Sequence, residues 1–194
     1  MNTFVLATHN KHKIEEFNAI LGELIPGITV IGYDGPEPVE DGVSFAENAL
    51  IKARAAAAHT GLPSISDDSG ICVDVLGGAP GIFSARWAGA QKDNAANVQL
   101  LLDQLSDVRD VDRGAHFTCH IAVVNPVTNE EFVVVGNWPG MIAREVHGVN
   151  GFGYDPIFIP EGYEVSAAIL DPSEKNALSH RARALHALAE KLNS

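Results

Sequence analysis

The chain has 194 residues, of which 46% are hydrophobic and 20% charged, a composition typical of one globular domain or of two lobes sharing a core. Its 13 basic and 25 acidic residues give a formal net charge of −12. A general binder of nucleic-acid backbones needs basic surface, which this balance does not offer. Nucleic acid is therefore excluded as a partner, and any phosphate site must be local. Disorder and fibrous repeats are excluded as well.

Apolar runs along the chain are short. The strongest, Ile121–Val124 and Phe132–Val135, are strand-sized, far below the roughly 18–20 residues of a membrane span. The N-terminus lacks a basic segment followed by a long apolar one, so we expect a cytoplasmic protein without a membrane partner. Cys72 and Cys119 have neither CxxC spacing nor a nearby Cys/His set, which favours reduced core thiols over a disulfide or zinc site.

Strands and helices alternate in the first half of the sequence. The pattern predicts, in chain order, a strand at residues 3–8, a helix ending at Leu24, a strand near 28–31, a helix over about 44–59, and a strand over 64–76 interrupted by a polar turn at 67–70. The alanine-rich composition of the second helix favours it intrinsically.

The pattern of the second half predicts a hairpin, so the sheet is expected to be mixed rather than purely parallel. The predicted elements are a helix around 94–105, strands near 116–124 and 131–135 joined by residues 125–129, and a last helix over about 176–192. The fold class is therefore α/β, with helices flanking a central mixed sheet. We expect one domain over residues 1–194, built as two lobes with the active-site cleft between them.

The turn between the first strand and helix is a candidate phosphate site. Its sequence is Thr8-His9-Asn10-Lys11-His12-Lys13. A helix N-terminus offers unpaired N–H groups and partial positive charge to an anion, and two lysines add full charges. The loop lacks the glycines of a GxxxxGK[ST] motif, so it is not a Walker-type cradle. An ordinary helix cap with solvated lysines is the alternative interpretation.

Two acidic pairs form the second candidate. Glu40 and Asp41 precede the long helix, and Asp67 and Asp68 stand in the segment Asp-Asp-Ser-Gly. Mg²⁺ commonly takes one or two carboxylates, with water and substrate phosphate completing its ligands. Adjacent desolvated aspartates also raise one another's pKa unless a cation compensates, so one can bind metal and another act as a base. An exposed turn is the competing interpretation of the second pair.

The long helix carries polar residues at a spacing of four. Ser44, Asn48 and Lys52 fall along one side, with Glu47 beside them. A solvated face explains this pattern, but Lys52 lies on a helix that connects the two acidic segments, so it is also placed to counter their charge.

The C-terminal third holds two further polar or aromatic segments. Gly151–Pro156 combines flexible backbone with Phe152 and Tyr154, which suits either a stacking shelf for a base or a packed aromatic turn. Lys175 and Ser179-His180-Arg181 stand near the last helix and offer hydrogen-bond donors. Donors at such a site would distinguish a purine with a 6-keto acceptor from adenine, whose 6-amino group donates. A common polar patch is the alternative.

Taken together, these segments resemble one family over nearly the whole chain: the non-canonical purine nucleoside triphosphate pyrophosphatases, also called inosine triphosphate pyrophosphatases or XTP/dITP diphosphatases. The matching segments, in order, are Leu6–Lys13, Phe45–Ala53, Asp67–Gly70, Gly78–Gly81 with Ser84–Arg86, Gly151–Pro156 and Ser179–Arg181. Many members have glycine in the first segment where this sequence has His9 and His12. The resemblance implies an elongated two-lobed α/β fold and a homodimer.

The resemblance also implies an activity. Such enzymes are Mg²⁺-dependent hydrolases that cleave ITP, dITP or XTP between the α- and β-phosphates, giving the monophosphate and pyrophosphate and removing deaminated purines from the nucleotide pool. The metal-binding carboxylates of the family correspond to Glu40 and Asp68 and its general base to Asp68. The lysine that pairs with these charges corresponds to Lys52. The choice between Glu40 and Asp41, and between Asp67 and Asp68, stays open at this point.

The substrate contacts that the resemblance implies fall in both halves of the sequence. The small-molecule partner, a purine nucleoside triphosphate, would be bound by Thr8, His9, Asn10, Lys11, His12, Lys13, Ser69, Phe152, Gly153, Tyr154, Asp155, Lys175, His180 and Arg181. Two alternatives are a related pyrophosphatase for modified pyrimidine nucleotides and a non-catalytic nucleotide sensor. The Phe-Gly-Tyr-Asp and Ser-His-Arg segments argue against the first, and the joint presence of Glu40, Asp68 and Lys52 argues against the second.

Overall fold

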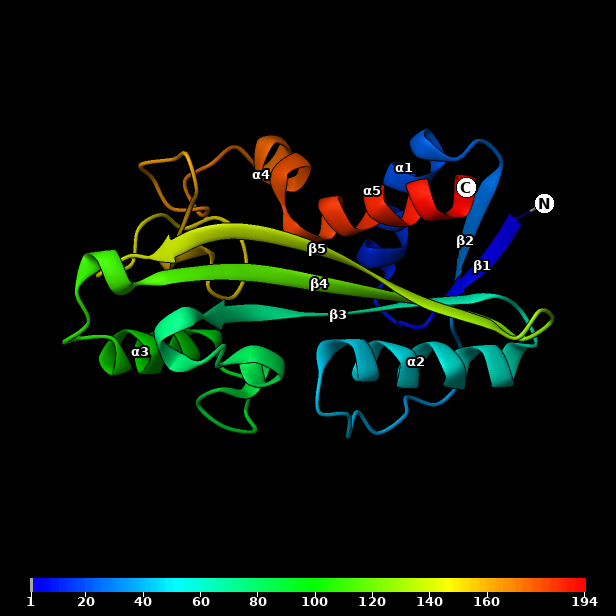
Figure 1. Cartoon of the computed structure of the whole chain (residues 1–194), viewed down its shortest axis with the longest axis horizontal. Coiled ribbons are helices and arrows are strands. Elements are labelled where there is room, and N and C mark those ends of the chain that lie inside the picture. The colour runs from blue at the N-terminus through cyan, green and yellow to red at the C-terminus, as the bar shows by residue number, and fades with distance from the viewer. Residues whose placement is uncertain (1) are drawn as a thin grey trace. The chain divides into compact units, whose positions relative to one another are not determined.

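The computed structural model describes residues 2–194, apart from the side chain of Asn2 (Figure 1). Its strands are β1 (Asn2–Leu6), β2 (Ile28–Gly32), β3 (Ser64–Val73), β4 (Gly114–Asn125), β5 (Glu130–Ile142) and β6 (Phe158–Pro160). Its α-helices are α1 (Lys11–Leu24), α2 (Phe45–Thr60), α3 (Asn94–Gln104), α4 (Pro172–Leu178) and α5 (His180–Asn193). Short 3₁₀ helices cover Asp74–Leu76, Gly81–Arg86, Asp110–Asp112 and Asp155–Ile157.

The strands of this described part form one six-stranded sheet in the order β2-β1-β3-β4-β5-β6. β1 pairs in parallel with β2, where Phe4 lies opposite Val30, and with β3, where Leu6 lies opposite Ile65. β5 and β6 are antiparallel, with Met141 opposite Ile159. The α/β class and the mixed sheet flanked by helices are thus confirmed.

The chain divides into two compact units. The first contains the chain up to Asp68, then Cys119–Gly136 and Arg181–Ser194; the second contains Ser69–Thr118 and Asn137–His180. Strands β3, β4 and β5 each contribute residues to both. The cleft expected between two lobes stays a prediction.

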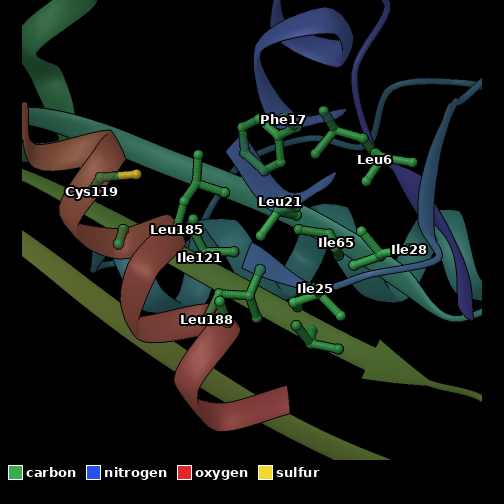
Figure 2. Packing of buried hydrophobic residues seen from close by; sticks show 14 residues of the cluster. Leu6, Phe17, Leu21, Ile25, Ile28, Ile65, Cys119, Ile121, Leu185 and Leu188 are labelled. Atoms are coloured by element: carbon green, nitrogen blue, oxygen red, sulfur yellow. The ribbon is translucent and has the colours of Figure 1, made fainter. Parts of the chain in front are cut away.

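In the first unit, helices cover both faces of the strands. α1 and α5 lie on one face and α2 on the other (Figure 1). Because side chains alternate along a strand, Ile121 packs with α1 and α5, whereas Ala122 packs with α2. Figure 2 shows the larger of these cores, in which Phe17, Leu21 and Leu185 are fully buried. On the other face alanines of α2 allow that helix to approach the strands closely.

The second unit has its own apolar core. Rings of Phe117, Trp138 and Phe158 meet there, and the edge-on pair of Phe117 and Phe158 has its centroids 4.7 Å apart. Buried Arg113 donates to the carbonyl oxygens of Leu105, Ile142 and Ala143 at 2.6–2.8 Å, which ties the end of α3 to β5. Both cysteines of the chain are free and buried, so the expectation of core thiols is confirmed.

Three sequence expectations about the elements are wrong. The polar segment 67–70 does not interrupt a strand, because β3 runs without a break to Val73. β5 continues seven residues beyond the expected end at Val135, to Ile142. The last helix is two helices, with α4 ending at Leu178 and α5 beginning at His180. Ser179 between them has extended backbone, with φ −60° and ψ 158°.

The helices of the described residues include none that is both long enough and apolar enough to cross a membrane.

Candidate active site

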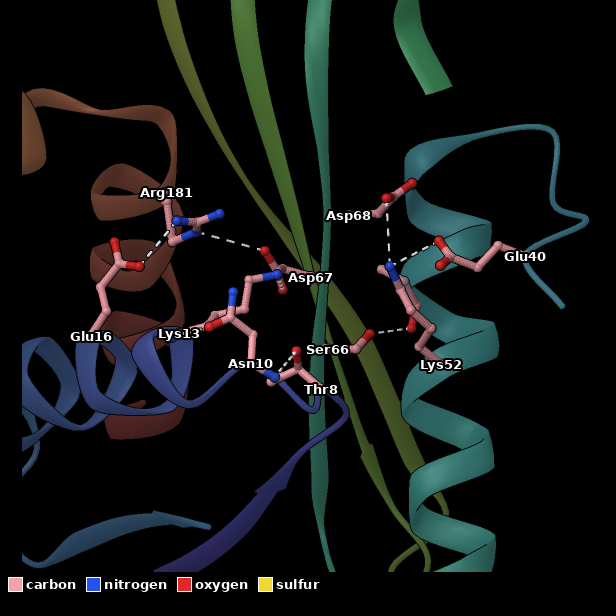
Figure 3. Close-up of polar contacts among 11 residues, drawn as sticks. Thr8, Asn10, Lys13, Glu16, Glu40, Lys52, Ser66, Asp67, Asp68 and Arg181 are labelled. Atoms are coloured by element: carbon pink, nitrogen blue, oxygen red, sulfur yellow. Dashed lines mark hydrogen bonds and ion pairs between the residues drawn. The ribbon is translucent and has the colours of Figure 1, made fainter. Parts of the chain in front are cut away.

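The turn after β1 is organised by its own side chains. Asn10 caps α1 by accepting a hydrogen bond from the Lys13 amide at 3.3 Å, and its own amide donates to the Thr8 hydroxyl at 3.2 Å. Lys11 and His12 are exposed. The helix cap given as the alternative interpretation of this turn is therefore present, and it directs Lys13, in the first turn of the helix, toward β3 (Figure 3).

Asp67 lies on the side of β3 that faces α1 and α5. Its carboxylate is 2.7 Å from Lys13 Nζ and 3.7 Å from Arg181 Nε, and its side chain is 4% exposed. Burial alone raises a carboxyl pKa, but the charges of Lys13 and Arg181 outweigh it and hold the pKa of Asp67 well below its usual range. Asp67 is therefore an ionised partner for two cations.

Arg181, the second residue of α5, is held from two sides. Its Nη1 donates to Glu16 of α1 at 3.0 Å, while Nε faces Asp67 without a hydrogen bond among the described residues. Burial lowers its pKa, but Asp67 and Glu16 more than offset this and raise it. The guanidinium stays charged and keeps an N–H group that can donate to another acceptor.

Asp68 lies on the opposite side of β3, toward α2 (Figure 3). Lys52 Nζ is 3.5 Å from its carboxylate and 2.9 Å from that of Glu40, and Asn48 donates to Asp68 at 3.2 Å. Burial raises the pKa of Asp68, and the nearby charge of Glu40 adds to this, against the opposing effect of Lys52. The pKa of Lys52 is raised because the two carboxylates outweigh its burial. One lysine thus joins two carboxylates from different segments.

The alternation of side chains along β3 separates the two adjacent aspartates. Asp67 is committed to Lys13 and Arg181, whereas Asp68 meets Glu40 around Lys52. Among the acids considered from the sequence, Glu40 and Asp68 are thus the pair that converges; Glu40 and Asp41 are both exposed, and Glu40 is the one whose carboxylate contacts Lys52.

The donor set around Lys52 suits a magnesium ion that brings ligands of its own. No group of three or more His, Cys, Asp or Glu side chains within residues 2–194 is arranged to hold a metal by itself. Mg²⁺ does not require one, since one or two carboxylates plus waters and phosphate oxygens satisfy it. Glu40 and Asp68, which share a single lysine, leave uncompensated negative charge at this point.

The second unit contains the aromatic segment. Phe152 is 77% exposed, but Tyr154 is buried and donates from its hydroxyl to the Ser84 carbonyl at 2.8 Å. The sequence allowed either a packed aromatic turn or a stacking shelf for a base. Tyr154 is packed in the turn, whereas the exposed ring of Phe152 is available for stacking. Gly153 between them has φ of 61°, a left-handed conformation that glycine adopts without strain.

Asp155 organises this segment from inside. Its buried carboxylate accepts from the Phe152 amide and pairs with Lys175 Nζ of α4 at 2.6 Å. A Cβ at Gly151, whose φ is 85°, would collide with the Asp155 carboxylate. Asp155 and Lys175 are thus brought together as an internal ion pair.

Three more of the expected site residues, Ser69, His180 and His9, lie outside the two ion-pair groups around Asp67 and Lys52. Ser69 Oγ is buried without a hydrogen-bond partner among the described residues. The His180 ring stacks on Phe117 with a centroid distance of 5.0 Å. His9 turns its ring to the segment after β2, with Nε2 3.1 Å from the Gly35 carbonyl oxygen.

The sequence reasoning missed one residue of the cluster, Glu16, and the role of another, Asp67. Glu16 lies three positions after Lys13, a spacing that places both on one face of α1 and was available as a signal. The role of Asp67 as partner of Lys13 and Arg181 had no sequence signal, because these residues are 54 and 114 positions away from it.

Fold and cluster together define a class: an α/β protein whose first unit gathers lysine, arginine and carboxylate side chains around the middle of one strand. The chain belongs to the Ham1 family, whose sequence profile matches residues 4–191. It is 60% identical over 190 residues to a dITP/XTP pyrophosphatase of Leifsonia xyli subsp. xyli, a match that covers 98% of this chain and 95% of that protein.

Other relatives agree with this placement. A dITP/XTP pyrophosphatase of Streptomyces avermitilis is 51% identical over 194 residues, covering 97% of this chain and 96% of its own. Among solved structures, a HAM1 protein from Coxiella burnetii superposes with a TM-score of 0.92 at 43% identity, over 100% of this chain and 99% of that one.

Proposed function

We propose that the protein hydrolyses non-canonical purine nucleoside triphosphates, namely ITP, dITP and XTP, to the monophosphate and pyrophosphate. The observation that carries this proposal is the convergence of Asp68 and Glu40 on Lys52, from three separate segments. It is supported by membership of the Ham1 family and by relatives named dITP/XTP pyrophosphatase. Removal of such nucleotides would keep deaminated purines out of the pool that polymerases use.

In this proposal Glu40 and Asp68 would hold Mg²⁺, which when bound would supply positive charge to the phosphate oxygens. Lys13 and Lys52 add fixed positive charge. Asp68 orients a water molecule and takes its proton. The water oxygen forms a bond to the α-phosphorus, the bond from this phosphorus to the bridging oxygen breaks, and pyrophosphate leaves with that oxygen.

The first loop would contact the phosphates through Thr8, Asn10 and Lys13 and through its backbone amides. Ser69, with its buried hydroxyl, is the further phosphate contact proposed. His9, Lys11 and His12 would contribute through the main chain, since the ring of His9 is engaged elsewhere and the other two side chains point to solvent.

Selection of the nucleobase is assigned to the hydrogen-bond donors of His180 and Arg181 and to the exposed ring of Phe152. Arg181 Nε and His180 would donate to the 6-keto oxygen, and an adenine amino group there would leave them unsatisfied, which disfavours ATP. Phe152 would stack on the base, in a loop that Gly153, Tyr154 and the Asp155–Lys175 pair hold in shape.

The decisive experiment incubates the protein with ITP, XTP, dITP, GTP, ATP and dTTP in the presence of Mg²⁺ and measures pyrophosphate separately from single phosphate. The proposal expects pyrophosphate from the first three and little from ATP or dTTP. Preference for dTTP or a modified pyrimidine nucleotide would favour the pyrimidine alternative, and binding without product would favour the sensor.

We also propose that the protein is a cytoplasmic homodimer, as its resemblance to the family implies. Light scattering coupled to gel filtration tests the dimer: a mass near 41 kDa, twice the 20.6 kDa of the chain, is expected. A mass of one chain at micromolar concentration would contradict it.

A further inference from the structure

His9 joins two loops of the first unit. Its Nε2 is 3.1 Å from the Gly35 carbonyl oxygen, and its Nδ1 is 3.2 Å from the Glu37 carboxylate. Both partners accept hydrogen bonds, so a ring with a proton on each nitrogen donates to both. The ring also stacks on Tyr33, with centroids 5.9 Å apart and an interplanar angle of 2°. Three contacts therefore fix one side chain of the first loop to the segment after β2.

That segment, residues 33–44, is called the acidic loop here, and it contains neither helix nor strand. Its start is folded tightly around Tyr33, whose buried ring donates from its hydroxyl to the Pro36 carbonyl at 3.0 Å. A Cβ at Gly35 would collide with the same ring, so the backbone passes directly across it.

The acidic loop is stiff between the His9 contacts and Glu40. Pro36 and Pro38 each fix their own φ near −65°, and each restricts the residue before it, which here includes Glu37. A constraint on Glu37 therefore sets the direction in which the chain leaves Pro38. Two residues later the chain reaches Glu40, whose carboxylate is 2.9 Å from Lys52.

We propose that His9 is a positioning residue, which clamps the acidic loop to the first loop and so holds Glu40 beside Lys52 and Asp68. The proposal rests on the proposed function, because Glu40 is assigned there to Mg²⁺. Without the clamp, Glu40 would have to be ordered each time a metal ion binds. The apparent affinity for Mg²⁺ would then be reduced in proportion to the fraction of molecules in which Glu40 is in place.

The first test is the Mg²⁺ requirement of ITP hydrolysis at saturating nucleotide. His9→Gly is expected to raise the Mg²⁺ concentration for half-maximal rate about three- to tenfold, the size of one or two lost hydrogen bonds, with kcat largely restored at high Mg²⁺. Glu37→Gln, at a side chain 75% exposed, should shift it less and in the same direction. His9→Arg restores a planar donor that stacks on Tyr33, so it should rescue the wild-type value.

His59→Ala is the matched control. His59 meets the Tyr33 ring edge-on, with centroids 5.6 Å apart, and its Nε2 is 3.7 Å from the exposed carboxylate of Asp34 at the start of the acidic loop; its side chain is 47% exposed against 49% for His9. It makes no hydrogen bond to Gly35 or Glu37 in the described structure, so the Mg²⁺ requirement should stay unchanged.

The second test uses the protein without metal or nucleotide, and so does not depend on activity. A Glu-specific protease can cut after Glu40 but cuts poorly after Glu37, which precedes proline. His9→Gly should increase the rate of cleavage at Glu40–Asp41 at least about threefold, as the loop opens more often, and His9→Arg and His59→Ala should not.

The outcomes separate cleanly. If wild type does not hydrolyse ITP, the proposed function fails, while the cleavage rates still decide whether the clamp exists. Unchanged cleavage in His9→Gly overturns the clamp. Faster cleavage with an unchanged Mg²⁺ requirement overturns the link to Glu40, and a higher KM for ITP at an unchanged Mg²⁺ requirement makes His9 a substrate contact instead.

Discussion

Asp67 and Asp68 are adjacent in the sequence, but their pKa values are shifted in opposite directions by their surroundings. The first is an ionised ion-pair partner with a lowered pKa, and the second is a half-buried carboxylate with a raised pKa beside one lysine. A group that must bind metal and accept a proton needs the second environment, since an anion committed to two cations is a poor base.

For Asp68→Asn we expect kcat for ITP to fall about 10²–10⁴-fold, since the amide cannot accept the proton of the attacking water. Its similar size preserves the hydrogen bond from Asn48. Steady-state kinetics of pyrophosphate release measure this, with Asp107→Asn, at an exposed aspartate, as the control. Intact kcat with only a raised KM would reduce Asp68 to a binding role.

Asp67→Asn tests stability. Because folding lowers the pKa of Asp67, its ionised form stabilises the folded state fully above the unfolded pKa of about 3.9, and this contribution is lost as pH falls toward the folded value. Urea unfolding should show the variant less stable by about 3–5 kcal/mol at pH 7, since Lys13 and Arg181 lose a buried partner. The difference should narrow at about pH 3. A gap that does not change with pH would refute the linkage.

Arg181→Ala tests base readout. We expect a selective loss of kcat/KM for ITP, with little change in any residual ATP hydrolysis. The Arg181 N–H group would donate to the 6-keto oxygen of hypoxanthine, whereas adenine has no acceptor at that position. Glu16→Gln keeps Arg181 but removes its charged partner, so a smaller loss of the same kind is expected. A uniform loss on both nucleotides would show that Arg181 serves phosphate or folding instead.

The loop 151–155 is the element in which two aromatic residues have different tasks. Phe152→Ala should raise KM for ITP about 5- to 150-fold, the equivalent of about 1–3 kcal/mol of lost stacking. Tyr154→Phe should leave KM unchanged and cost about 1 kcal/mol of stability, since it removes only the hydrogen bond to Ser84. Kinetics and thermal melting of both variants check this, and the reverse pattern would exchange the two assignments.

β3 shows where sequence reasoning about elements reached its limit. Local chemistry made Asp67–Gly70 a turn, because aspartate, serine and glycine are turn residues. The strand continues because each aspartate has a cation on its own side, Lys13 or Lys52, supplied by a different helix. Such partners are absent from any local window, so tertiary contact overrode propensity.

Elements whose signals are local were predicted well. The helix over 44–59 matches α2 within one residue at each end, because Ser44 caps it and Gly61 ends it with φ of 69°. The break at Ser179 was missed, since the apolar spacing continues across it. In the site, the spacing of Asn48 and Lys52 was visible from the sequence, whereas the choice between adjacent acids needed the direction of each side chain.

Charge at the scale of the whole molecule supports the proposal that the reaction requires Mg²⁺. The net charge is −12, and four of the cations assigned to the site already face carboxylates in the structure: Lys13, Lys52, Lys175 and Arg181. A bound triphosphate would add about four negative charges to this site. The lysines and the arginine of the site cannot neutralise that charge as well as the carboxylates they already face. Around Lys52 two carboxylates share one cation, whereas Asp67 and Glu16 are matched by Lys13 and Arg181, so the proposal places Mg²⁺ beside Glu40 and Asp68.

Chelation should therefore abolish ITP hydrolysis rather than slow it. EDTA is expected to reduce the rate at least about 10³-fold, since lost Lewis-acid stabilisation of several kcal/mol converts to that factor. Excess Mg²⁺ should restore it, and NaCl at equal ionic strength should not, because monovalent ions screen charge without binding both carboxylates and phosphate. Glu40→Gln should require more Mg²⁺ for the same rate. Activity that survives chelation would mean that Lys13, Lys52 and Arg181 neutralise the triphosphate unaided.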